Sequence, residues 1–319
     1  MMTPEVLHYL AIGLAIALAS IGSGIGQGIG AFSAVESLSR QSLGNDQVFR
    51  SMIIGLAFIE SGVILALVIS LMMLFGTTEV ITWGIALAEI GIAVMIGVSA
   101  AAISISSGYA VKSSAISISR QPIFSQKILT LMLVTQSMME APVVFSFVMA
   151  LILKSQFSST LSIYTGIKFL AASTCLTLGS IGPCLGQGIF ASSSCAAVGL
   201  NRSAYSKLLP FSIINGAVIQ TPLIFSLLLS ILIVFYPISE SNPISTVICF
   251  CIIAFTIGCG AFGTSTAAGF VGSKTAKQIA LNLESYSILF RSNILAQAFI
   301  ESSVIYALIV SLALLTKSF

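Results

Sequence analysis

The chain has 319 residues, of which 57% are hydrophobic and only 7% are charged. Soluble domains carry about a quarter charged residues, so this composition excludes a soluble globular protein and predicts an integral membrane protein. The net charge of +3 is too small to indicate a nucleic-acid partner.

Eight apolar runs of about 20 residues or more follow one another, each long enough for a helix to cross a bilayer. Short connections separate them, and no long soluble domain is left over. The stretch before the first run contains Glu5 and His8 but no lysine or arginine, unlike a signal peptide, so we expect the first helix to be retained. In chain order the predicted helices cover residues 8–33, 51–76, 81–107, 128–153, 161–190, 208–236, 245–272 and 291–316.

Related motifs recur about every 80 residues along the chain. A fixed period indicates a repeat architecture, and here the unit is a pair of helices. The sequence therefore predicts an all-α membrane protein of four tandem hairpins in one orientation, at residues 1–78, 79–157, 158–239 and 240–319. The equivalences are Gly26-Gln27-Gly28 with Gly186-Gln187-Gly188, Arg40-Gln41 with Arg120-Gln121, and Glu60 with Glu140, Gln220 and Glu301.

The first helix of each hairpin is rich in small residues. In the first hairpin, Gly22, Gly26 and Gly30 form one helical stripe and Gly24 and Gly28 form another. Such stripes allow close contact between membrane helices. Because all four hairpins keep this character, we expect an inner layer of tightly packed first helices, with the second helices outside.

The second helix of three hairpins carries a glutamate inside its apolar run: Glu60, Glu140 and Glu301. Each lies about ten residues into the run, near the middle of the membrane at 1.5 Å per residue. An ionisable residue at this depth indicates function, because a carboxyl can face lipid only when it is protonated or paired with a cation. The third hairpin has Gln220 instead, which carries no net charge, so we expect that hairpin to carry no ion. Apart from Pro142 and Pro222, nothing in these helices predicts a break.

Basic residues gather at the turns inside the hairpins, which predicts that the turns face the cytoplasm or matrix and both termini the opposite side. Two isolated charges, Glu89 and Lys168, fall at nearly the same height in adjacent first helices, so we expect them to form a direct or water-bridged pair. The six cysteines lack metal-site or disulfide spacing, and we expect no cofactor. The turn residues are Arg40, Arg50, Lys112, Arg120, Lys127, Arg202, Lys207, Lys274, Lys277 and Arg291, against Lys154, Lys168 and Lys317 elsewhere.

These features resemble the rotor-ring proteolipid, the c subunit of F-type rotary ATP synthases. The resemblance rests on GSGIGQGIGAFSAVESLSRQ followed by AFIESGV in the first hairpin, and on SRQP at 119–122 in the second. It covers essentially the whole chain but is weaker in hairpins 3 and 4, whose turns lack Arg-Gln. That proteolipid is usually a single hairpin, so four would be fused here.

The resemblance implies a non-catalytic protein whose copies form a homo-oligomeric ring that turns against a stator subunit (the a subunit). Glu60, Glu140 and Glu301 would carry H⁺ or Na⁺, while the turns at Arg40, Gln41, Arg120 and Gln121 would contact central-stalk subunits gamma and epsilon. It implies the bacterial or mitochondrial inner membrane. Hairpin 4 of one copy would then adjoin hairpin 1 of the next.

Two other classes of protein remain as alternatives. One is the V-type ATPase proteolipid, which is also built of fused hairpins, although Gln27 and the Arg-Gln turns favour the F-type. The other is a secondary transporter or channel. Such transporters tend to have inverted repeats and helices broken near the midplane, whereas these repeats are parallel.

The sequence leaves the transported ion open. Sodium needs several oxygen ligands, while a proton needs only the carboxyl and one hydrogen-bond partner. In sodium-binding relatives, the first-helix glutamine and the glutamate are joined by a hydroxyl that follows the glutamate of the adjacent hairpin. Gln27, Glu60 and Ser61 or Ser302 match this pattern, whereas hairpin 2 has Ser107, Glu140 and Ala141. Hairpin 3 keeps Gln187 beside Gln220, and hairpin 4 has Ala268 with Glu301.

Overall fold

The computed structural model describes residues 3–40, 44–76, 81–158 and 160–317. Within these ranges the regular structure is helical, and the spans long and apolar enough to cross a membrane number eight, as the sequence predicts. The turns Pro122–Phe124 (η2) and Arg202–Ala204 (η3) precede the second helices of hairpins 2 and 3. The helices are α1 (Pro4–Arg40), α2 (Asn45–Leu74), α3 (Trp83–Arg120), α4 (Ser125–Met139), α5 (Ala141–Ser155), α6 (Ile163–Leu200), α7 (Tyr205–Phe235), α8 (Pro243–Leu281) and α9 (Tyr286–Thr316).

The first helices are longer than their apolar runs. α3 and α6 each have 38 residues, or about 57 Å at 1.5 Å per residue, whereas the hydrocarbon layer is about 30 Å thick. Hydrophobicity marks only the part of a helix that lies in lipid. The polar residues near the turns continue the same helices outside the lipid, because the backbone N–H and C=O groups of a helix bond to one another in water as well as in lipid.

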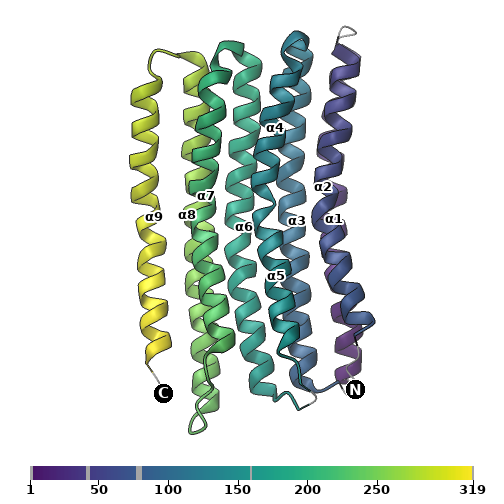
Figure 1. Ribbon diagram of the computed structural model, residues 1–319, viewed down its shortest axis with the longest axis vertical. Coiled ribbons are helices and arrows are strands. Elements are labelled where there is room, and N and C mark those ends of the chain that lie inside the picture. Colours follow the sequence, from purple (N-terminus) through teal and green to yellow (C-terminus); the bar gives the residue numbers. More distant parts are fainter. Residues whose placement is uncertain (1–2, 41–43, 77–80, 159, 318–319) are drawn as a thin grey trace.

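The four hairpins stand side by side in chain order and point in the same direction (Figure 1). The most extensive contacts join α1 to α3, α3 to α6 and α6 to α8, so the first helices form a continuous layer. The second helices α2, α4–α5 and α7 each pack on the first helix of their own hairpin and on that of the following hairpin, whereas α9 packs on α8 of its own hairpin. The predicted arrangement of first and second helices is therefore confirmed. The hairpin turns lie at one end of the molecule, and both termini lie at the other (Figure 1).

Small residues make the close approach within the inner layer possible. A Cβ atom at Gly26 would lie 2.1 Å from the carbonyl oxygen of Ser104, and one at Gly186 would lie 2.3 Å from the carbonyl oxygen of Ser265. Real Cβ atoms cannot come this close to a backbone oxygen. Residues larger than glycine would therefore push α1 from α3 and α6 from α8.

The two predicted stripes of α1 differ in their surroundings. Gly22, Gly26 and Gly30 face α3, whereas a Cβ at Gly24 or Gly28 would meet nothing within 4 Å. α1 and α9 belong to hairpins at opposite edges of the chain (Figure 1). The second stripe of α1 therefore lies on a free edge of the single chain.

The predicted direct ion pair of Glu89 and Lys168 does not form among the described residues. Glu89, only 1% exposed, pairs with His8 of α1. The Lys168 ammonium group donates hydrogen bonds to the carbonyl oxygens of Val234 (2.9 Å) and Tyr236 (3.2 Å) at the end of α7. The prediction of a direct pair was wrong because similar height does not set the direction of a side chain. His8 is the direct partner of Glu89, and two backbone carbonyls at a helix end accept from Lys168.

Candidate ion-carrying site

The four equivalent positions all belong to the second helices of their hairpins. Glu60 is in α2, Glu140 separates α4 from α5, Gln220 is in α7 and Glu301 is in α9. Pro142 accounts for the break at Glu140, since proline has no N–H for the helix ladder. α7 continues through Pro222 without a break.

Gln27 and Glu60 come together as the sequence predicts. The Gln27 side-chain N–H donates a hydrogen bond of 2.8 Å to a carboxyl oxygen of Glu60. Glu60 is otherwise exposed, because α2 lies on the free edge of the chain. Within the single chain, Gln27 is therefore the hydrogen-bond partner that the structure gives Glu60.

Each of the other two glutamates interacts with a hydroxyl of the preceding hairpin. Ser61 of hairpin 1 interacts with the carboxyl of Glu140 in hairpin 2. Thr221 of hairpin 3 interacts with the carboxyl of Glu301 in hairpin 4. The arrangement is the same in both cases: the residue directly after the acidic position of one hairpin interacts with the carboxyl at the acidic position of the next hairpin.

Thr221 is a residue of the candidate site that the sequence analysis did not identify. It occupies the same place in the repeat as Ser61 and Ser302, directly after the acidic position. The replacement of the acid by Gln220 hid it, because a hydroxyl beside an uncharged residue gives no sign of ion binding. The repeat spacing alone could have identified it.

The third hairpin is built differently. Gln187 is fully buried, and neither polar atom of its amide has a hydrogen-bond partner among the described residues. Gln220 instead donates a hydrogen bond of 3.1 Å from Nε2 to the carbonyl oxygen of Met138 in hairpin 2. The residue after Glu140 is Ala141, so no hydroxyl is supplied to position 220.

The set of Gln27, Glu60 and Ser302 is not assembled within one chain. The Ser302 hydroxyl donates to the carbonyl oxygen of Phe299 in its own helix, and the Ser61 hydroxyl donates to that of Phe58 in the same way. Ser302 is in α9 at one edge of the chain, while Glu60 is in α2 at the other (Figure 1). Only a second copy of the chain could bring them together.

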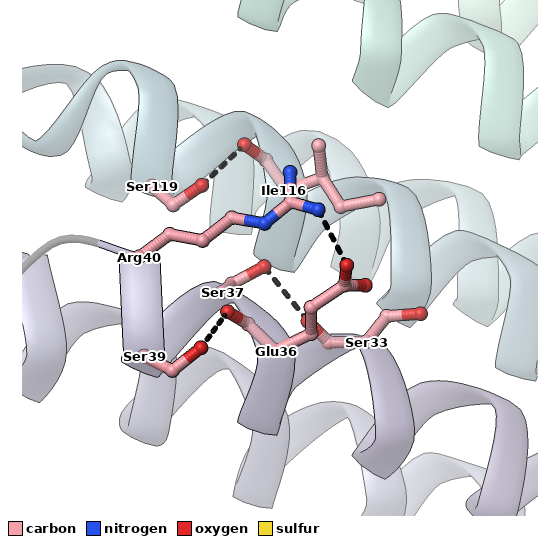
Figure 2. A network of polar contacts seen from close by, with 7 residues as sticks. All are labelled: Ser33, Glu36, Ser37, Ser39, Arg40, Ile116 and Ser119. Atoms are coloured by element: carbon pink, nitrogen blue, oxygen red, sulfur yellow. Dashed lines mark hydrogen bonds and ion pairs between the residues drawn. The ribbon is translucent and has the colours of Figure 1, made fainter.

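The turn end of the inner layer carries exposed arginines. Figure 2 shows Arg40, the last residue of α1, with its guanidinium paired to Glu36 one turn earlier. Arg120 is also exposed at the end of α3, whereas Gln41 lies outside the described residues. The hydroxyls of Ser37, Ser39 and Ser119 donate to backbone carbonyls of their own helices, that of Ser37 to the carbonyl oxygen of Ser33 (Figure 2), so Glu36 and Arg40 are the charged groups of this network.

Gln121 has a structural contact at this end. Its side-chain Nε2 donates to the carbonyl oxygen of Gly199 at 2.8 Å, which ties the turn of hairpin 2 to α6. Asn201, one repeat later, donates to the carbonyl oxygen of Ala280 at 2.8 Å in the same manner. The turn amides therefore join neighbouring hairpins, which the sequence alone does not reveal.

Comparison with known proteins agrees with this architecture. The family model of the ATP synthase C subunit matches residues 10–73, 90–153 and 251–314, which together exceed half of the chain. The matched segments contain Glu60, Glu140 and Glu301 in turn, and the unmatched part between them contains hairpin 3. No curated protein matches the chain. With its parallel helical hairpins and mid-span carboxyls, the chain belongs to the ATP synthase C-subunit family.

Proposed function

We propose that this chain forms the rotor ring of an F-type rotary ATP synthase or ATPase, with Glu60, Glu140 and Glu301 as proton carriers. The observation that carries the proposal is the repeated pairing of a mid-span carboxyl with a polar group from a neighbouring helix. The chain itself is non-catalytic. It couples ion movement through the membrane to ATP synthesis or hydrolysis elsewhere in the assembly.

Copies of the chain would close into a ring through their two free edges. Within the chain, Gly188 of α6 faces Ser106 of α3, in the preceding hairpin. Gly28 is the equivalent of Gly188 but has nothing within 4 Å, and the same is true of Gly263 in α8. Packing α8 of one copy on α1 of the next continues the repeat and covers both glycines. By the same rule, Ser302 of hairpin 4 then reaches Glu60 of the next copy.

The proposed cycle follows from the cost of placing charge in lipid. Each glutamate crosses the lipid protonated and releases its proton where it meets a basic group of the stator. Arg40 and Arg120 are placed at the turn end, where subunits gamma and epsilon of the central stalk would bind. The excess of basic residues at the turns orients them to the cytoplasm or matrix of a bacterial or mitochondrial inner membrane.

A proton fits all three sites better than sodium does. Sodium needs several oxygen ligands, whereas a protonated carboxyl needs only one hydrogen-bond partner. Glu140 has Ser61, and Glu301 has Thr221 but Ala268 where a glutamine would stand. Only the junction between copies offers Gln27, Glu60 and Ser302 together. A rotor has to load the same ion at every carrier. Because the sites with the fewest oxygen ligands suit only a proton, we propose the proton as the ion for all three.

Carbodiimide labelling of the purified ring tests the function and the ion together. The reagent modifies protonated carboxyls, so we expect Glu60, Glu140 and Glu301 to be modified at low pH and protected as the pH rises. Sodium chloride is expected to give no more protection than potassium chloride at the same ionic strength. Specific protection by Na⁺ would establish the sodium alternative, and no labelling at any of the three would contradict the carrier role.

Gln220 is expected to make hairpin 3 a silent position of the rotor. Each chain would then carry three ions while four hairpins pass the stator, because an amide cannot release a proton. One charge that crosses 100 mV is worth about 2.3 kcal/mol, so a missing carrier lowers the energy available for ATP synthesis and favours pumping against a steeper gradient. The check is the measured ion-to-ATP ratio beside the number of hairpins counted in the ring. A ratio that requires every hairpin to carry an ion would contradict this prediction.

A further inference from the structure

Two prolines stand at the same place in hairpins 2 and 3. Pro142 follows Glu140 by two residues, and Pro222 follows Gln220 by two residues. A helical carbonyl normally accepts from the N–H four residues later, and proline has no N–H. The carbonyl oxygens of Met138 and Val218 therefore lose their regular helix partner.

The structure shows what takes the place of that partner in hairpin 2. The carbonyl oxygen of Met138 accepts a hydrogen bond of 3.1 Å from the Gln220 side-chain Nε2. The donor comes from the acidic position of the following hairpin. A buried carbonyl has to be satisfied, and here the neighbouring hairpin satisfies it.

Hairpins 3 and 4 repeat this geometry with a carboxyl in place of the amide. Glu301 stands one repeat after Gln220, and Val218 stands one repeat after Met138. The Glu301 carboxyl lies against Thr221, which is one helical turn after Val218 on the same face of α7. Oxygen Oε1 of Glu301 is buried and has no hydrogen-bond partner among the described residues. A carboxyl can supply the missing donor only when it is protonated.

Hairpins 1 and 4 lack this device. Gly62 and Ser303 occupy the proline position, so the carbonyl oxygens of Phe58 and Phe299 keep an N–H four residues later. Each of these carbonyls accepts in addition from the serine hydroxyl that follows the acid, Ser61 or Ser302. The acceptors offered by hairpins 1 and 4 are therefore already bonded within their own helix.

We propose that Pro142 and Pro222 each convert a backbone carbonyl into the hydrogen-bond acceptor for the acidic position of the next hairpin. Gln220 donates to the Met138 carbonyl at every pH, because its amide, unlike a carboxyl, does not lose a proton. Glu301 occupies the Val218 carbonyl only in its protonated form. Pro222 is thus a positioning residue that favours protonated Glu301, and this role rests on the carrier function proposed above.

No other titratable group near Glu301 among the described residues is positioned to favour its protonated form in the same way. Thr221 is the neighbouring polar side chain that interacts with its carboxyl, and no charged partner accompanies it within the described residues. The titratable groups of the surrounding elements are Tyr205 and Lys207 of α7, Cys249, Cys251, Cys259, Lys274 and Lys277 of α8, and Tyr286, Arg291 and Tyr306 of α9 itself. Tyr306 is the nearest of them in sequence, five residues after Glu301, and its side chain is exposed.

The test is the substitution Pro222→Ala in the full-length chain, assembled as the ring. Alanine restores an N–H that competes for the Val218 carbonyl, so protonated Glu301 loses part of its stabilisation. We expect the pH of half-maximal carbodiimide labelling at Glu301 to fall by about 0.4 to 1 unit. The labelling of each glutamate is followed separately by mass spectrometry of its peptide. Alanine also favours the helix, so the variant is expected to fold.

Two controls accompany this measurement. Pro210→Ala makes the same chemical change three turns earlier in α7, and it should leave the midpoint of Glu301 unchanged. Glu60 within the Pro222→Ala ring should keep its midpoint, because no proline precedes its site. An unchanged midpoint at Glu301, or an equal fall in the Pro210→Ala ring, would overturn the inference. Glu301 that is never labelled in the unsubstituted ring would instead contradict its role as a carrier, and this inference with it.

Discussion

Replacement of the carboxyls by glutamine is expected to reduce ion-coupled ATPase activity unequally, with the greater loss for Glu140→Gln and Glu301→Gln than for Glu60→Gln. In the proposed function, the rotor already moves one uncharged position, Gln220, past the stator in every chain. Glu140→Gln or Glu301→Gln places a second uncharged hairpin directly beside it. Glu60→Gln leaves Glu140 and Glu301 as carriers on the two sides of Gln220, so the two uncharged hairpins are never adjacent.

The size of the effect follows from the energy of each carrier. A missing charge removes about 2.3 kcal/mol of coupling energy for every 100 mV of potential. Two adjacent uncharged hairpins therefore double the angle through which the ring turns without an ion crossing. The measurement is proton pumping and inhibitor-sensitive ATPase activity in vesicles that contain rings of each variant. The variant with all three glutamates replaced should show no coupled activity. Gln220→Leu, which removes the hydrogen bond to Met138 but no carrier, serves as the control. Full coupling in the triple variant would show that these glutamates do not carry the ion.

A methyl group on α1 is expected to have opposite consequences at two glycines only two residues apart. Gly26→Ala places a Cβ 2.1 Å from the carbonyl oxygen of Ser104, which is backbone and cannot turn away. We expect the isolated chain in detergent to lose about 1–3 kcal/mol of stability through overpacking of α1 against α3. Thermal unfolding followed by circular dichroism measures this loss.

Gly28→Ala should leave the isolated chain intact and impair the ring. A Cβ at Gly28 meets nothing within 4 Å in one chain, and alanine favours the helix by about 1 kcal/mol. At the equivalent Gly188, however, a Cβ would lie 2.7 Å from the side chain of Ser106. We therefore expect native gels to show fewer closed rings for Gly28→Ala, while the isolated chain unfolds at a temperature no lower than that of the unsubstituted chain. Normal ring assembly would mean that this edge of α1 is not the contact between copies.

The eight spans, their grouping into hairpins and the positions of the three glutamates are all predictable from the sequence. Hydrophobicity decides which segments enter the membrane, and a repeat of about 80 residues identifies equivalent positions without knowledge of the fold. The pairing of Gln27 with Glu60 also follows from the repeat and the family resemblance. These features depend on short segments or on regular spacing, so each can be recognised one segment at a time.

The partners of the buried polar groups depend on the tertiary structure. Glu89 pairs with His8 rather than with Lys168, Gln220 bonds to Met138 rather than to Gln187, and Thr221 belongs to the site of Glu301. Each outcome depends on how a helix is rotated about its axis and on which backbone groups its neighbours leave unpaired. Glycine contacts at Gly26 and Gly186 set that rotation, and Pro142 frees the carbonyl that Gln220 uses. Spacing along one chain gives the height of a side chain in the membrane, whereas its direction comes only from the packing of the helices against one another.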